Sequence, residues 1–155
     1  MEARDIKELF VNNNKTLGSI ESFTGGLFAS EITKVPGASK FYKGGVVSYA
    51  TEEKIKVVKV NKGIVDKYGV VSQECAKEMA TKGRQLLNVD YCISFTGNAG
   101  PDAMENKPVG EVYIGLASEK ETIVIKKNLT GNRENIQKEA IKIAYEILEK
   151  NFQKK

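Results

Sequence analysis

Apolar positions recur along the chain with two spacings, one typical of helices and the other of strands. Five stretches with helical spacing or helix-start signals are predicted to be helices: residues 5–14, 27–34, 52–60, 71–88 and 134–152. Five shorter runs rich in β-branched and aromatic residues are predicted to be strands: residues 15–22, 44–50, 89–95, 112–118 and 122–129. Only "EKE" separates the last two strands, which predicts a hairpin.

Strands and helices alternate through most of the chain, which favours an α/β fold with three layers, an α/β/α sandwich. The sheet is predicted to be mixed and mostly parallel, with three parallel strands first and the antiparallel hairpin added later. No internal repeat or linker interrupts the pattern, so residues 1–155 are expected to form a single domain. Ligands bind at the carboxyl ends of such strands. Three polar turns are therefore predicted to meet in one crevice: "ESFTGG", "SYATEEK" and "TGNAGP".

The absence of histidine restricts the chemistry that the chain can perform. Ser-His-Asp triads, Cys-His pairs and histidine-ligated zinc sites are impossible, so a nucleophile here needs Lys, Asp, Glu, Tyr or an external group as its base. Cys75 and Cys92 lie in apolar patterns without ligand spacing, which predicts two buried thiols. Acidic residues are scattered without ligand spacing, so no metal site is predicted.

The charge pattern argues against two classes of partner. Lys and Arg number 24 and Asp and Glu 20, and the resulting charge of +4 is spread along the chain, which disfavours a nucleic-acid-binding module. No run approaches the roughly 18 to 20 apolar residues that a membrane span requires. The charged start "MEARDIKELF" lacks the apolar core of a signal peptide, so the protein is expected to be cytoplasmic.

The two main candidates for catalysis are Ser22 and Lys54. Ser22 stands where a predicted strand passes through a glycine turn into a helix, a position that exposes a hydroxyl beside free backbone N–H groups. A serine that caps the helix explains the same pattern. Lys54 falls in the first turn of a predicted helix, where the helix dipole favours the neutral amine, a possible base for serine. A solvated lysine explains its spacing equally well.

Three further residues follow the same strand ends. Tyr49 could donate to a lysine or serine side chain, although a half-buried strand tyrosine is the simpler interpretation. Thr96 and Gly97 begin a loop of small residues that lets a ligand approach the backbone, and Arg133 could clamp a phosphate or carboxylate. None of these signals is specific by itself.

The ordered segments "ESFTGG", "GGVVSYATEEK", "YGVVSQE", "TGNAGP", "KPVG" and "GNR" resemble the CinA C-terminal domain family over about residues 5 to 150. Stand-alone members are nicotinamide-nucleotide amidases. The resemblance implies hydrolysis of nicotinamide mononucleotide, a small-molecule substrate, to nicotinate mononucleotide and ammonia in pyridine-nucleotide salvage. It implies no cofactor, and it implies a homo-oligomer.

The family's Ser-Lys pair falls on Ser22 and Lys54, and its supporting residues fall on Tyr49, Thr96 and Arg133. The resemblance thereby implies substrate-binding positions at Thr24, Gly25, Gly26, Thr96, Gly97 and Arg133, with the glycine turn supplying oxyanion donors. The chain departs from the family at Phe23, where cysteine is common, and at Asp102-Ala103, where the loop often continues with two glycines. The rival hypothesis is a homologue that binds a nucleotide or a protein partner without turnover.

Overall fold

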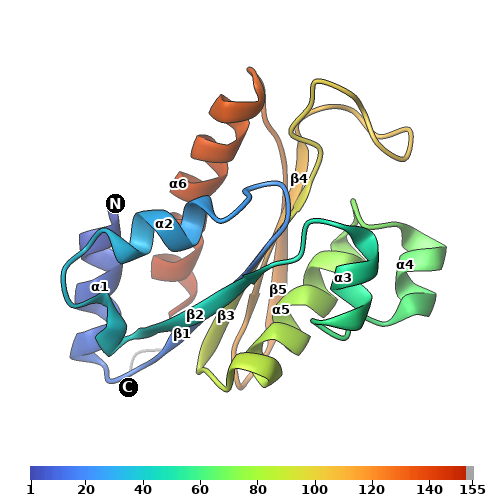
Figure 1. Ribbon diagram of the computed structural model, residues 1–155. Helices are drawn as coiled ribbons and strands as arrows, with labels where there is room; N and C mark the ends of the chain where they lie inside the picture. Colours follow the sequence, from blue (N-terminus) through green and yellow to red (C-terminus); the bar gives the residue numbers. More distant parts are fainter. Residues whose placement is uncertain (153–155) are drawn as a thin grey trace.

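The computed structural model describes residues 1–152, and its centre is a five-stranded mixed sheet in the order β2-β1-β3-β4-β5 (Figure 1). The strands are β1 Leu17–Glu21, β2 Tyr42–Val47, β3 Tyr91–Gly97, β4 Glu111–Ala117 and β5 Thr122–Asn128. β1 pairs in parallel with β2 and β3, whereas β4 is antiparallel to β3 and to β5. Four of the five strands therefore run in one direction, which confirms the mixed, mostly parallel sheet.

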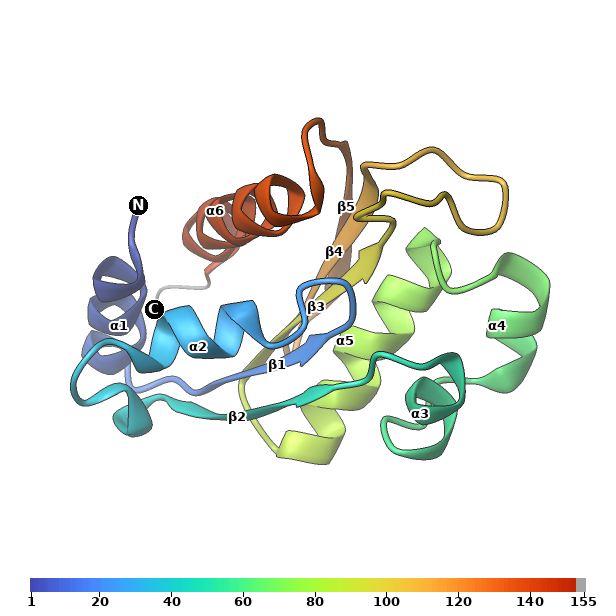
Figure 2. The same cartoon turned by 45° about the horizontal axis from the view of Figure 1, so that its top comes forward.

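Helices cover both faces of this sheet (Figure 2). One face carries α1 Ala3–Asn12, α2 Leu27–Thr33 and α6 Arg133–Asn151, and the other carries α3 Thr51–Lys56, α4 Lys62–Tyr68 and α5 Gln73–Leu87. A short 3-10 helix, Ala38–Lys40, leads into β2. The three-layer α/β/α sandwich predicted from the sequence is confirmed. Among the residues described, no helix combines the length and apolar character needed to cross a membrane.

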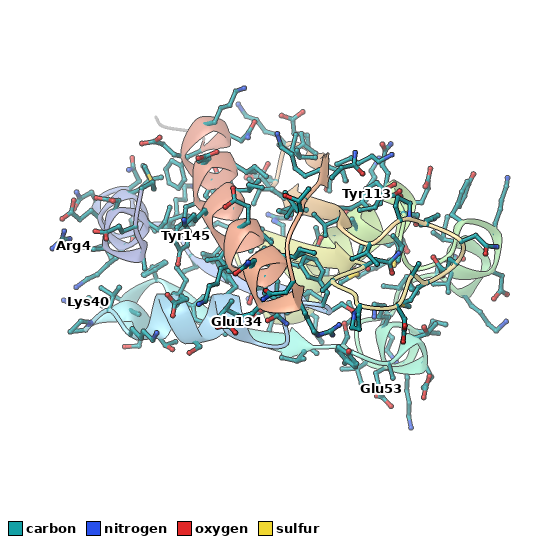
Figure 3. All side chains as sticks on the ribbon, turned by 90° about the horizontal axis from the view of Figure 1, so that it is seen from above. Arg4, Lys40, Glu53, Tyr113, Glu134 and Tyr145 are labelled. Atoms are coloured by element: carbon teal, nitrogen blue, oxygen red, sulfur yellow. The ribbon has the colours of Figure 1, made fainter. Side chains whose placement is uncertain are left out.

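The two faces of the sheet are packed differently. Aromatic rings fill the face under α1, α2 and α6, where Tyr145 projects from α6 toward α2 (Figure 3) and its ring centroid lies 6.0 Å from that of Phe28. The opposite face is tighter, because a Cβ on Gly83 of α5 would lie 2.3 Å from Ile20 Cγ1. Cys75 and Cys92 are buried and free on this face, as predicted, and burial raises the pKa of Cys75 to about 11.

Two helices near the site differ from the prediction. Helix α3 begins at Thr51 itself, with Ala50 as its N-cap, and ends at Lys56 rather than near residue 60. It stops there because Lys59 adopts a left-handed backbone conformation, with φ 74°, and the chain then turns toward α4. Helix α4 was not predicted. The Asn61 side chain caps it by accepting from Ile64 N at 3.2 Å.

Candidate active site

The three polar turns meet at the carboxyl ends of β1, β2 and β3, around a cavity of about 100 Å³. Its walls come from five parts of the chain that are far apart in sequence. They are Ser22 and Phe23; Tyr49, Thr51 and Lys54; Val70; residues of the segment 96–104; and Arg133. A larger cavity of about 820 Å³ lies elsewhere, between α1, α2 and α6, away from these turns. The parallel topology thus brings the predicted turns together.

Ser22 and Lys54 contact one another inside this cavity. Lys54 Nζ lies 2.9 Å from Ser22 Oγ, 2.7 Å from the Ser48 carbonyl oxygen and 3.2 Å from the Tyr49 carbonyl oxygen. Only 1% of Lys54 and 8% of Ser22 are exposed. Lys54 is therefore not the solvated surface lysine that its spacing also allowed.

The three partners of Lys54 favour one arrangement of its protons. Carbonyl oxygens only accept, so two N–H groups of a neutral amine point at Ser48 and Tyr49. The nitrogen lone pair then faces Ser22 Oγ, which can donate its hydroxyl proton. This is the geometry of a general base beside a nucleophile.

Burial also favours the neutral amine. Desolvation lowers the pKa of Lys54 below its ordinary value of 10.5, because the charged form loses hydration in the protein interior. The negative charges of Glu105 and Glu52 oppose this shift but do not cancel it. A larger fraction of Lys54 is therefore neutral near pH 7 than for a lysine in water.

Glu21, which sequence reasoning missed, organises the turn that carries Ser22. Its buried carboxylate accepts from Thr24 Oγ1 at 2.7 Å, Phe28 N at 2.9 Å and Ala29 N at 3.0 Å. It thereby satisfies the first amides of α2, which otherwise have no intrahelical acceptor. The one signal in the sequence was a carboxylate in an apolar strand, directly before the serine.

The turn itself needs glycine, because Gly25 and Gly26 have φ values of 59° and 99°. The Gly25 N–H donates to the Ser22 carbonyl at 3.0 Å and closes the turn. The Thr24 hydroxyl is occupied by Glu21. None of Thr24, Gly25 and Gly26 is among the residues that line the cavity. Their observed role is to shape the turn that presents Ser22.

Tyr49 and Arg133 lie at the cavity together. The Tyr49 backbone carbonyl contacts Lys54, whereas its exposed hydroxyl accepts from Arg133 Nη2 at 2.6 Å. Arg133 Nη1 donates to the Gly100 carbonyl at 2.6 Å. The guanidinium thus links the end of β2 to the loop after β3, and Tyr49 meets Lys54 through its backbone rather than its ring.

Thr96 and Gly97 contribute to the cavity walls at the end of β3. The buried Thr96 hydroxyl donates to the Val70 carbonyl at 2.7 Å, which ties β3 to the segment before α5. A Cβ on Gly97 would lie 2.7 Å from Val112 Cα, so only glycine fits against β4. In the structure, Thr96 and Gly97 fix the end of β3 against the segment before α5 and against β4.

The loop between β3 and β4 forms one wall and is fixed in place. Asn98 Nδ2 donates to the carbonyls of Lys107 at 3.1 Å and Met104 at 3.3 Å, which closes the loop. The Glu105 carboxylate accepts from Val70 N at 2.9 Å and Val71 N at 3.0 Å, which docks the loop on the chain before α5. The wall is therefore preformed.

Together the fold and this geometry define a three-layer α/β/α protein with a buried serine-lysine pair at the carboxyl edge of its parallel strands. The family model described as the CinA C-terminal domain matches residues 2–152. The chain belongs to the CinA C-terminal domain family. Within residues 1–152, no group of three or more Cys, Asp or Glu side chains is arranged to hold a metal ion.

Relatives and solved structures agree with this assignment. A putative competence-damage inducible protein of Geobacillus sp. is 44% identical over 146 residues, which cover 94% of this chain and 35% of the relative. A CinA-like protein of Fervidobacterium nodosum is 39% identical over 148 residues, with coverages of 95% and 36%. The chain thus spans well under half the length of these relatives.

Two crystal structures have the same fold. The competence damage-inducible protein A from Klebsiella pneumoniae has a TM-score of 0.94 at 25% identity, covering 97% of this chain and 96% of that one. The competence/damage inducible protein CihA from Agrobacterium tumefaciens has a TM-score of 0.93 at 27% identity, with coverages of 97% and 93%.

Proposed function

We propose that this protein is an amidase that hydrolyses nicotinamide mononucleotide to nicotinate mononucleotide and ammonia. The observation that carries the proposal is the contact of 2.9 Å between Lys54 Nζ and Ser22 Oγ, in which the other two partners of the amine are carbonyl acceptors. The choice of substrate rests on the resemblance of the chain's six motifs to the stand-alone amidases. Neither support requires histidine.

In the proposed reaction, neutral Lys54 takes the hydroxyl proton of Ser22 while Oγ forms a bond to the carboxamide carbon. The carbonyl oxygen becomes an oxyanion. The Lys54 ammonium then returns the proton to the leaving nitrogen, the C–N bond breaks, and ammonia departs from an acyl-serine. Water, deprotonated by the same amine, attacks the ester carbon. The bond between that carbon and Ser22 Oγ breaks, the Lys54 ammonium returns its proton to Oγ, and the released acid ionises to the carboxylate.

The donor to the oxyanion is proposed to be the backbone of the nucleophile turn. Phe23 follows the serine directly and lines the cavity. Among the described residues, the Phe23 N–H has no acceptor, whereas the Gly25 N–H is bonded to the Ser22 carbonyl. Because its N–H is unbonded and the residue lines the cavity, Phe23 is the proposed donor, and the Gly25-Gly26 turn supports it indirectly. Arg133, with its charge at the cavity, is proposed to hold the substrate's phosphate.

The proposal is tested by incubating the purified chain with nicotinamide mononucleotide and EDTA and measuring ammonia and nicotinate mononucleotide. We expect both products from the wild type and neither from Ser22→Ala. Ser30→Ala is the matched control, because Ser30 is exposed on α2. A folded wild type that binds the nucleotide and releases no ammonia would instead support the non-catalytic homologue.

The pH dependence of the reaction follows from the state of Lys54. The base must be neutral, so kcat/KM is expected to rise with pH and to level off above the pKa of Lys54. Because burial lowers that pKa, the midpoint of the rise should lie below 10.5. A pH-rate profile measured at constant ionic strength checks this expectation. A midpoint at or above 10.5 would contradict a desolvated lysine as the base.

A further inference from the structure

The cavity around Ser22 carries a cation and an anion that do not pair with each other. Arg133 and Asp102 both line it. Every ion pair within residues 1–152 joins other side chains: Arg4–Glu2, Lys34–Glu31, Lys62–Asp66, Lys107–Glu105 and Lys138–Glu134. The remaining lysine of the lining, Lys54, is engaged by Ser22 and two carbonyls. Two opposite charges are thus left for a ligand.

The partners of Arg133 leave its charge uncompensated. Its two donor contacts go to the Gly100 carbonyl and the Tyr49 hydroxyl, both of which are neutral. These contacts fix the position of the guanidinium without neutralising it. An anionic group of a ligand would find a preorganised cation there.

Asp102 belongs to the loop that Arg133 contacts. It follows Gly100, the residue bound by Arg133, by two positions, and it belongs to the loop that Asn98 closes and Glu105 docks. Asp102 is exposed and makes no hydrogen bond or ion pair within the described part of the chain. Its carboxylate is therefore held at the cavity by the loop and remains free to meet a cationic group.

Such a wall discriminates between ligands by charge. A purely anionic ligand is attracted by Arg133 and repelled by Asp102, whereas a ligand with both signs of charge can satisfy both groups. If the proposed function holds, the substrate is of the second kind, with a cationic pyridinium ring and an anionic phosphate. Its reduced form has a neutral dihydropyridine ring and the same phosphate.

From this arrangement we infer that Asp102 is a specificity-determining residue that selects the oxidised, positively charged pyridine ring over the reduced ring, while Arg133 faces the phosphate. The inference rests on the proposed function, since it assumes a pyridine nucleotide in this cavity. The selection also has a chemical consequence. A pyridinium ring withdraws electrons from its carboxamide, so the form that Asp102 favours is the form more easily attacked by Ser22.

Binding measurements test the inference without turnover. Calorimetric dissociation constants of oxidised and reduced nicotinamide mononucleotide are compared between Ser22→Ala and Ser22→Ala/Asp102→Asn. We expect the Asn variant to bind the oxidised form about two- to fivefold more weakly, the range for an exposed charge pair, and the reduced form no more weakly than before. Ser22→Ala/Asp66→Asn is the matched control, because it removes the same charge from the exposed surface of α4.

Equal weakening of both forms, or no change in either, overturns the role of Asp102 while leaving the amidase proposal intact. An equal effect of Asp66→Asn also overturns it, because a general change in net charge would then explain the result. If neither form binds Ser22→Ala, the inference falls together with the nucleotide substrate of the proposed function. Selective weakening of the oxidised form supports it.

Discussion

Replacing Lys54 by methionine is expected to lower turnover of the proposed amide substrate by about a thousandfold or more. Methionine has nearly the length of lysine but no lone pair, so Ser22 loses the only base within hydrogen-bonding distance in the described structure. Removing a general base or a nucleophile typically costs several orders of magnitude in kcat. Ser22→Ala should cause a loss of similar size, because the two residues act as one unit.

The variant is expected to remain folded. Removing the amine relieves the desolvation of a buried polar group, but it leaves the Ser48 and Tyr49 carbonyls without their donor. These effects oppose one another, so the free energy of unfolding should change by no more than about 2 kcal/mol near neutral pH. Lys56→Met is the matched control, since Lys56 is exposed on the same helix. Turnover of Lys54→Met near the wild-type rate would rule out Lys54 as the base.

The same variant gives a second readout, the pH dependence of stability. The pKa of Lys54 is lowered in the folded protein and is ordinary, at 10.5, in the unfolded chain. Between these two values the unfolded state binds more protons, so the wild type gains stability as pH rises through this window. Lys54→Met lacks this gain. Urea unfolding at several pH values below 10.5 should show the difference.

Much of the fold could be predicted from the sequence because its signals are local. Helix α5 has a clear apolar face and the Ser72 side chain as its cap, which accepts from Cys75 N at 3.1 Å. The hairpin of β4 and β5 follows from two β-rich runs around a short polar segment. Helix α4 was missed because it is short, with seven residues, and only Val65 of its side chains is buried.

The meeting of the three turns at the candidate site could also be predicted, but the contacts between their residues could not. Parallel strands place their carboxyl ends on one edge, so the three polar turns had to meet. Which lysine of "EEKIKVVK" points inward depends on how α3 is rotated against the sheet, and tertiary packing decides that rotation. The structure buries Lys54 and leaves Lys56 and Lys59 exposed. No spacing rule distinguishes these three residues.

Replacing Glu21 by alanine is expected to destabilise the protein by about 2 to 4 kcal/mol, because the change removes a buried acceptor from several donors at once. The Thr24 hydroxyl and the Phe28 amide would lose their partner in a buried environment, and the Ala29 amide would lose its partner in a partly buried one. Urea unfolding measures the effect. Glu31→Ala on α2 is the control, since it removes only a surface ion pair with Lys34 and should change stability by less than about 1 kcal/mol.

Glu21→Gln separates the shape of this residue from its acceptor capacity. Glutamine fills the same volume but keeps a single acceptor oxygen, so one of the two helix amides would face an NH₂ group and the variant should lie between wild type and alanine in stability. The turnover of Glu21→Gln tests whether Glu21 positions Ser22. The turn anchored by Glu21 carries Ser22, and a shift of about 1 Å in a reacting group can cost on the order of a hundredfold in rate. We therefore expect folded Glu21→Gln to lose kcat while Lys54 still sets the midpoint of its pH-rate profile. Wild-type stability and rate in this variant would show that Ser22 is held by the glycine turn alone.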